Sequence, residues 1–405
     1  MTEMNQKPPQ IFGREKDSWA EETITVRLPD ILQRTIEEND FSDAAADQLK
    51  SLIQEIPNGK IRPLQDPWAP DADLWQSYIQ PWEGKDWLNV PWLFAEHYFY
   101  RRVMEGIDYF TTGEDPFLIQ KEMGFEQAGS MIERYADLLE EWIDSDQSAG
   151  RRIKDGLLYS LWGNQADLSL WPVGSEAAPD HTDLSSLQDH LLEDHSQDII
   201  RHLTRKRDSQ VRVGIILDNA GLELVNDLAF VDILFETETA AEITLLVKAH
   251  PTFVSDVIEQ DVRRTVSNLR GSNKKSVSQL GSRLEGYLDI GRLKIAADFF
   301  WNSPLAMWEM PARLRKALEK YLLVISKGDA NYRRILGDRK WDFTLAFPEV
   351  VDYFPVSLAA LRSLKAELAL GMSLDGIVEV HNQDSDWMIN GRWAVVQFSP
   401  GRGNQ

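Results

Sequence analysis

The 405-residue chain contains no cysteine. Without thiols it can form neither a disulfide framework nor a thiolate zinc site, and it has no cysteine nucleophile. Basic residues are also scarce, because 43 lysines and arginines stand against 65 aspartates and glutamates, a net charge of −22. A surface that acidic repels a phosphate backbone. We therefore expect no nucleic-acid partner.

Long apolar runs are missing as well. No stretch approaches the roughly 18 apolar residues that a membrane-spanning helix needs. The first residues have neither the apolar segment of a secretion signal nor the character of a transit peptide. We expect a cytoplasmic protein with no membrane partner. The hydrophobic share of 43% supports a real core, and the length exceeds what a single core usually serves.

The first part of the chain has the apolar spacing of helices. Two segments carry it most clearly, residues 91–107 and 128–143. Residues 171–186 are rich in small, turn-forming residues and proline, which is typical of an exposed connection, and a helix is expected over Leu187–Leu203. We interpret residues 1–165 as a mainly helical N-terminal domain and residues 166–205 as a connection and helix.

The period changes after residue 205. The apolar run Val211–Leu217, a helical pattern and the run Ile243–Lys248 predict a βαβ unit, which implies a parallel sheet buried on both faces. Further strands are expected at Tyr321–Ser326 and Ala366–Gly371, and Asn390-Gly391 indicates a hairpin near the end. We interpret residues 206–405 as a metal-binding catalytic domain. The fold class is α/β: a helical layer followed by a three-layer α/β/α domain with a mostly parallel sheet and a C-terminal β-hairpin.

Ligands of open parallel sheets bind beyond the carboxyl ends of the strands. Asp218 and Asn219 follow their strand directly, and Asp256 comes a few residues after the next strand. Their oxygens suit hard divalent cations such as Mg²⁺ or Mn²⁺. Caps of the following helices would explain the same residues equally well, since Asp and Asn are favoured there.

A polar segment follows the strand at residues 321–326. It contains Lys327, Asp329, Asn331 and Arg333, a mixture that suits a phosphorylated, hydroxyl-rich ligand. An ordinary solvated turn closed by Gly328 is the plainer alternative.

Two further signals are weak by themselves. Arg362 and Lys365 are three residues apart and would share one face of a helix. Glu223 lies in the first turns of the helix after Asp218, where the helix dipole alone favours a carboxylate.

Taken together, six ordered blocks resemble the metal-dependent damage-control phosphatases, formerly a domain-of-unknown-function family. The similarity is to the subgroup of the yeast sugar-phosphate phosphatase and the human acidic residue methyltransferase-like protein. It covers the chain from about residue 80 to the end. The blocks are Pro91–Arg102, Leu161–Leu170, Leu217–Leu228, His250–Asp256, Lys327–Trp341 and Leu361–Lys365.

The resemblance implies roles for individual residues. Asp218, Asn219 and Asp256 match the metal-binding and catalytic positions of the family, and Glu96 and Glu223 match carboxylates of a proposed S-adenosylmethionine site. Here the subgroup's Arg-Thr-x-Lys motif has serine in place of threonine. The substrate contacts implied are Asp218, Asn219, Lys327, Asp329, Asn331, Tyr332, Arg333 and Lys365.

The activity that this resemblance implies is metal-dependent hydrolysis of phosphomonoesters of small metabolites in damage control. Sugar phosphates such as fructose 1-phosphate or fructose 6-phosphate are the expected substrates, and Mn²⁺, Co²⁺, Ni²⁺ or Mg²⁺ the expected cofactor. Asp218 could serve as a ligand, a base or a nucleophile. Two alternatives stay open: an S-adenosylmethionine-dependent protein carboxyl methyltransferase, although the glycine-rich turn is missing, and a non-catalytic metabolite-binding module.

Overall fold

The computed structural model describes residues 7–163, 188–205 and 210–401. Its strands run in one sheet of order β1-β7-β6-β5-β2-β3-β4. All neighbouring strands pair in parallel except β6 and β7, which are antiparallel. The strands are β1 (Leu191–Asp194), β2 (Arg212–Ile216), β3 (Glu242–Val247), β4 (Leu293–Ala297), β5 (Leu323–Lys327), β6 (Ser357–Ser363) and β7 (Ala394–Ser399).

Helices cover both faces of this sheet, as expected for parallel strands that are apolar throughout. One face carries α7 (Leu118–Gln127), α8 (Gly129–Asp144), α9 (Ala149–Trp162), α11 (Ser196–Thr204), α12 (Leu222–Glu236), α13 (Glu259–Arg270) and α14 (Lys275–Asp289). The other carries the short helices η4 (Phe299–Asn302) and η5 (Met307–Glu309) and α15 (Ala312–Leu318), α16 (Asp329–Leu336), α17 (Phe347–Val350) and α18 (Leu374–Gln383).

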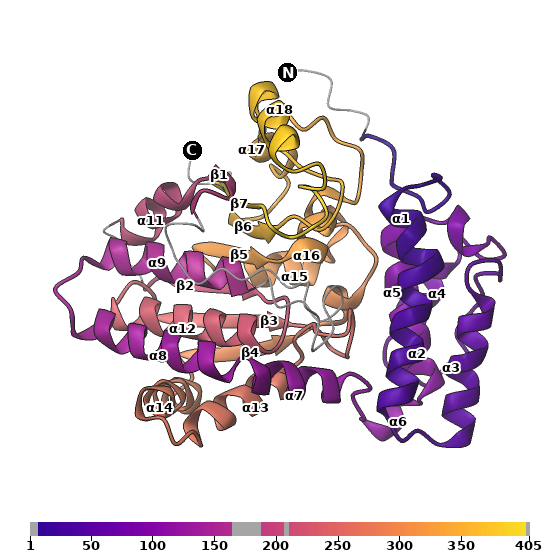
Figure 1. Ribbon diagram of the computed structural model, residues 1–405, viewed down its shortest axis with the longest axis horizontal. Helices are drawn as coiled ribbons and strands as arrows, with labels where there is room; N and C mark the ends of the chain where they lie inside the picture. The colour runs from indigo at the N-terminus through magenta and orange to yellow at the C-terminus, as the bar shows by residue number, and fades with distance from the viewer. Residues whose placement is uncertain (1–6, 164–187, 206–209, 402–405) are drawn as a thin grey trace.

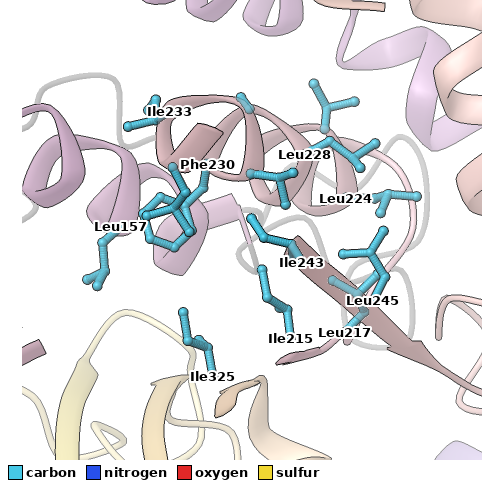
Figure 2. Close-up of a cluster of buried hydrophobic side chains, with 14 of the residues drawn as sticks. Leu157, Ile215, Leu217, Leu224, Leu228, Phe230, Ile233, Ile243, Leu245 and Ile325 are labelled. Atoms are coloured by element: carbon cyan, nitrogen blue, oxygen red, sulfur yellow. The ribbon is translucent and has the colours of Figure 1, made fainter. Parts of the chain in front are cut away.

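The alternation of side chains along the central strands divides the core in two. Ile215 and Leu245 pack with α12 and α9, whereas their neighbours Ile216 and Leu246 pack on the opposite face. Figure 2 shows the first cluster, in which Leu224 and Leu228 of α12 lie over β2 and β3. Two packed layers on one buried sheet give the expected three-layer α/β/α arrangement.

The remaining helices form a separate block at the N-terminus. They are α1 (Trp19–Glu22), the π-helical turn η1 (Thr23–Arg27), α2 (Leu28–Glu38), α3 (Asp43–Glu55), α4 (Ala72–Ile79), η2 (Trp87–Asn89), α5 (Trp92–Gly106) and α6 (Tyr109–Thr112). Figure 1 shows this N-terminal block standing beside the sheet domain, on the right. Its aromatic core also takes in Val254 and Ala366 from loops of the sheet domain.

The α/β class and the mostly parallel sheet are confirmed. The helical segments expected at 91–107 and 128–143 correspond to α5 and α8, and the strands expected around 211–217, 243–248 and 321–326 correspond to β2, β3 and β5. The helices α8 and α9, expected in the N-terminal domain, pack on α12, and α7 packs on α8. The domain boundaries at 165 and 205 stay a prediction.

Three local predictions were wrong. The segment Leu187–Leu203 holds β1 before α11, so it is a helix only in its second half. Ala366–Gly371 is not a strand, and the neighbouring strand β6 ends before it. Gly391 does make a turn, at φ +71°, but the residues directly before it form no strand, and β7 pairs in antiparallel fashion with the distant β6 instead of closing a hairpin.

Among the described residues, no helix is long and apolar enough to cross a membrane. The exposed connection expected at 171–186 lies outside the described residues.

Candidate functional site

The strand order reverses beside β2. From β2 the chain proceeds outward through β3 and β4, and it then returns to place β5 on the other side of β2. The helices that follow these two neighbours, α12 after β2 and α16 after β5, lie on opposite faces of the sheet. Such a switch point leaves a crevice at the carboxyl ends of the strands, where open α/β sheets bind their ligands. Asp218 and Gly328 stand at its two sides.

The loops after β2 and β3 are joined backbone to backbone. Asn219 and Asp256 form an antiparallel bridge, and the N–H of Ala220 donates to the carbonyl of Ser255 over 2.7 Å. The N–H of Val257 donates to the carbonyl of Asp218 over 2.8 Å. This pairing brings the three acidic and amide side chains predicted as metal ligands to one place.

Hydrogen bonds fix the orientation of the Asn219 amide. Its nitrogen donates to the carboxylates of Asp218 (2.9 Å) and Glu223 (2.8 Å), and its oxygen accepts from the hydroxyl of Ser255 (2.6 Å). An amide oxygen has two lone pairs, so one remains beside the serine contact.

Gly328 makes room for the Asp218 carboxylate. Its φ is +83°, a conformation that glycine adopts freely, and a Cβ there would lie 1.9 Å from Oδ2 of Asp218. The carboxylate thus rests against bare backbone of the loop after β5.

Asp218, Asn219 and Asp256 line one pocket between the sheet edge and the N-terminal block. The cavity itself is small, about 60 Å³, and it opens to solvent at its mouth. Its lining is Trp19, Thr23, Arg27, Leu28, Ile31, Trp92, Glu96, Tyr100, Asp218, Asn219, Phe253, Asp256, Asp329, Ala330, Arg333 and Lys365. The pocket therefore collects the three predicted metal ligands, two of which were also predicted to contact substrate, three further predicted substrate contacts and Glu96.

Arg333 is held in the pocket wall by two carboxylates. Its Nε and Nη2 donate to Asp338 over 2.8 and 3.1 Å, and Nη1 lies 2.7 Å from Glu96. The guanidinium stacks 3.6 Å from the ring centre of Trp92. Asp338 also accepts from the backbone N–H of Leu93 in the first turn of α5 (3.2 Å), so the same carboxylate ties the arginine to the N-terminal block.

Glu96, in the same wall of the pocket, has a raised pKa. Burial raises the pKa of its carboxyl to about 7, against the opposing charge of Arg333.

Lys365 follows β6 at the far side of the pocket. Its backbone N–H donates to Asp329 over 3.2 Å, and its carbonyl accepts from the indole of Trp19 over 3.1 Å. Arg362 does not share a helical face with Lys365, because it belongs to β6; its Nε binds Asp329 over 2.6 Å. Arg362 thus orients an acidic residue of the pocket without lining it.

Lys327 points away from the pocket into a buried ionic cluster between the sheet and α12. Its Nζ donates to Glu223 (2.9 Å), Asp227 (2.8 Å) and the carbonyl of Ser160 (2.5 Å). Burial alone would lower the pKa of Lys327, but the two carboxylates outweigh it and raise that pKa; burial raises the pKa of Asp227 to about 6. Lys327 and Glu223 are therefore outside the pocket lining.

Asn331 and Tyr332 also lie beneath the pocket. The segment predicted as a polar loop is the helix α16, which begins directly after Gly328. Asn331 donates to the carbonyls of Leu217 (3.1 Å) and Lys327 (2.9 Å), and so joins the ends of β2 and β5. The hydroxyl of Tyr332 donates to Gln397 over 2.7 Å.

Sequence reasoning missed several residues of the site. Lys248, the last residue of an apolar run, lies 3.1 Å from Asp256 and is fully buried. Burial lowers the pKa of this lysine, and Asp256 opposes the shift. A lysine ending a predicted buried strand was the available signal. No pattern in the sequence marks Asp338 or Arg27 as site residues, since only the fold brings them to the pocket.

Asp218, Asn219 and Asp256 bring the oxygen donors that a divalent cation needs to one pocket. Among the described residues there is no group of three or more His, Cys, Asp or Glu side chains that could hold a metal. Two carboxylates and one amide oxygen nevertheless meet in the pocket, and Mg²⁺-type sites commonly use one or two carboxylates, with waters and substrate phosphate completing the shell. The residues present fit such an ion.

Comparisons with known proteins identify the family of the chain. The family profile of the Damage-control phosphatase ARMT1-like domain matches residues 23–377. Proteins named Damage-control phosphatase ARMT1 are similar along nearly their whole length: the mouse protein is 31% identical over 98% of this chain and 99% of its own. The human protein is 32% identical over 96% and 98%, and that of Danio rerio 31% over 97% and 97%.

A solved structure, that of a DUF89 family protein from Pyrococcus horikoshii, covers 92% of this chain and 96% of its own, with 13% identity and a TM-score of 0.47. A structural similarity with so low a TM-score supports no statement about the fold of this chain. The profile match over most of the chain and the sequence similarity are decisive, and they confirm the resemblance seen in the ordered blocks. The chain belongs to the family of ARMT1-like damage-control phosphatases.

Proposed function

We propose that this protein is a metal-dependent phosphatase of the cytoplasm that hydrolyses phosphomonoesters of small metabolites, with sugar phosphates such as fructose 1-phosphate or fructose 6-phosphate among them. One observation carries the proposal. Oxygen donors for a cation, Asp218, Asn219 and Asp256, line the same pocket as the cations Arg333 and Lys365. Hydrolysis of a phosphate dianion needs both kinds of group within reach of one small ligand.

The proposed metal is Mn²⁺, Co²⁺, Ni²⁺ or Mg²⁺, held by Asp218, Asn219 and Asp256. When bound, such an ion supplies charge for the phosphate oxygens and lowers the pKa of a coordinated water.

The chain's own cations have a separate task. Each terminal nitrogen of Arg333 carries a second N–H beyond the one used by Asp338 or Glu96, and these can donate to phosphoryl oxygens. Because Asp338, Glu96 and Trp92 already fix the guanidinium, little side-chain entropy is lost when it binds. Lys365 adds a second cation from the neighbouring strand end.

The predicted substrate contacts fall into two groups under this proposal. Asp329, Arg333 and Lys365 line the pocket and would meet the ligand. Lys327, Asn331 and Tyr332 are better supported as groups that hold the strand ends together.

The methyltransferase alternative has less support. Glu96 lines the pocket, but Glu223 contacts Lys327 and Asn219 outside the lining, so the two carboxylates do not face one shared cavity. The chain also lacks a glycine-rich turn after β2.

The test is phosphate release from a panel of phosphate esters after removal of bound metal, with each of the four ions and with chelator. We expect release only with metal, and a loss of at least about 100-fold in Asp218→Asn and Asp256→Asn, which keep the side-chain size. Asp342→Asn, in an exposed turn, is the matched control.

A second measurement does not depend on activity. Metal should raise the melting temperature of the wild type, because a ligand that binds only the native state stabilises it, and this rise should shrink in both variants. Release that persists in chelator, or variants as active as the control, would contradict the assignment.

A further inference from the structure

The helix that covers the pocket contains an unusual turn. Residues 23–27 are π-helical and continue directly from α1 into α2. Such turns are rare and occur frequently at functional sites. Here four residues spaced by four, Trp19, Thr23, Arg27 and Ile31, all line the pocket.

The π-helical turn explains why this stripe stays aligned. In an α-helix a step of four residues overshoots one turn by about 40°, so three such steps would carry the last residue about 120° off the pocket. A π-helical turn holds more residues, so the same step falls short of a full turn there. The middle step, from Thr23 to Arg27, therefore cancels part of the drift and turns Arg27 towards the pocket.

Arg27 contacts Trp19 and Thr23 in the pocket wall. Its guanidinium lies 4.8 Å from the ring centre of Trp19, and Nη1 donates to the hydroxyl of Thr23 over 3.4 Å. A guanidinium carries its N–H groups in one plane, an arrangement that suits the oxygens of a phosphate or carboxylate.

The charges of the pocket come from two sides. Arg333 and Lys365 belong to the sheet domain together with the proposed metal ligands, whereas Arg27 comes from the N-terminal block. A substrate with its phosphoryl group at the sheet edge would extend towards the block, where Arg27 lines the pocket together with Glu96. Burial raises the pKa of Glu96, and the charge of Arg27 opposes that rise.

We propose that Arg27 binds an anionic group at the end of the substrate remote from the scissile phosphate, so that the site prefers phosphomonoesters that carry a second phosphate or a carboxylate. This inference rests on the proposed function, and it narrows the substrate class of the same pocket. Arg27 is thus a specificity residue: it contributes to binding of the distal group and not to bond cleavage.

The experiment compares a hexose monophosphate with the corresponding bisphosphate by kcat/KM, in the wild type and in Arg27→Gln. The wild type should favour the bisphosphate by roughly 10- to 100-fold, the range of a charge-assisted hydrogen bond. In Arg27→Gln the preference should vanish because KM for the bisphosphate rises far more than KM for the monophosphate. Arg27→Lys, which keeps the charge without the planar fork, should retain part of it.

Arg34→Gln is the matched control, since Arg34 lies on the same helix outside the pocket and pairs with Glu38. Equal losses for both esters in Arg27→Gln, or no bisphosphate preference in the wild type, would overturn the inference while leaving the phosphatase intact. If the wild type hydrolysed no ester with any metal, the proposed function itself would fail, and this inference with it.

Discussion

Gly328→Ala is the most direct test of the site's geometry. The substitution adds one methyl group to the loop after β5. That methyl group would lie 1.9 Å from Oδ2 of Asp218 and 2.0 Å from its Cγ, well inside van der Waals contact. Either the loop or the carboxylate must move, and both belong to the pocket.

The cost has two parts. Alanine at φ +83° and ψ 170°, a backbone conformation that is essentially restricted to glycine, costs about 1–3 kcal/mol. Forcing an extra carbon into a packed site adds about 1–3 kcal/mol. We therefore expect a loss of about 2–6 kcal/mol in the free energy of unfolding, a large share of the roughly 5–15 kcal/mol of a typical domain.

Gly84 offers the matched control. It has φ +78°, but no atom lies within 4 Å of the position that a Cβ would take. Gly84→Ala should therefore cost only the conformational part, about 1–2 kcal/mol.

The assay is urea denaturation of both variants followed by circular dichroism, with metal titration by thermal shift alongside. Gly328→Ala should lose more stability than Gly84→Ala and should also lose most of its stabilisation by metal. Equal losses in the two variants, with metal stabilisation kept in both, would refute the close approach of Gly328 and Asp218.

Three further predictions concern buried charges. Asp338→Asn removes one of the two negative charges beside Arg333. We expect the free energy of unfolding, measured by urea denaturation, to fall by about 1.5–3 kcal/mol and the KM for phosphate esters to rise. An unchanged KM would show that Asp338 has no part in substrate binding. Burial raises the pKa of Glu96 to about 7, so the stability that its neutral form provides is full below the unfolded pKa of 4.5 and is lost as pH rises through 7. Between pH 4.5 and 8 the wild type should lose roughly 3 kcal/mol in the free energy of unfolding from this group, and Glu96→Gln should not show that loss. If the free energies of unfolding of the two proteins changed with pH in parallel, the raised pKa of Glu96 would be refuted. Lys327→Met leaves the buried carboxylates of Glu223 and Asp227 without their cation, so the free energy of unfolding in urea should fall by about 3–5 kcal/mol. A variant of unchanged stability with a raised KM would instead support Lys327 as a substrate contact.

The central sheet could be predicted because its strands are long apolar runs. β2, β3 and β5 are bounded by polar residues and lie between helical patterns. β4 and β6 were missed, because LKIAA and SLAALRS contain few of the β-branched residues that mark a strand. Ala366–Gly371 is as apolar as β6, and periodicity alone could not choose between them.

From the residue pattern alone, the site could be predicted only near the ends of strands. Asp218 and Asn219 are adjacent to β2, and strand-end reasoning finds them. Arg27 and Glu96 reach the pocket from the N-terminal block, which no local pattern connects to the sheet. Lys327 illustrates the opposite error: it was expected in a loop after the strand, but it is the last residue of β5, and its side chain projects to the α12 face, away from the pocket.

The shared core of the N-terminal block has a consequence for synthesis. The block is translated first, but Val254 and Ala366, which complete its aromatic core, leave the ribosome only after most of the chain has been made. Domains usually fold in the order in which they emerge. Here the packing of the first helices is complete only once these two residues have been made, and the loop that carries Lys365 contributes both to that packing and to the pocket. A nascent chain therefore gains its working site in the same late step that seals its earliest helices.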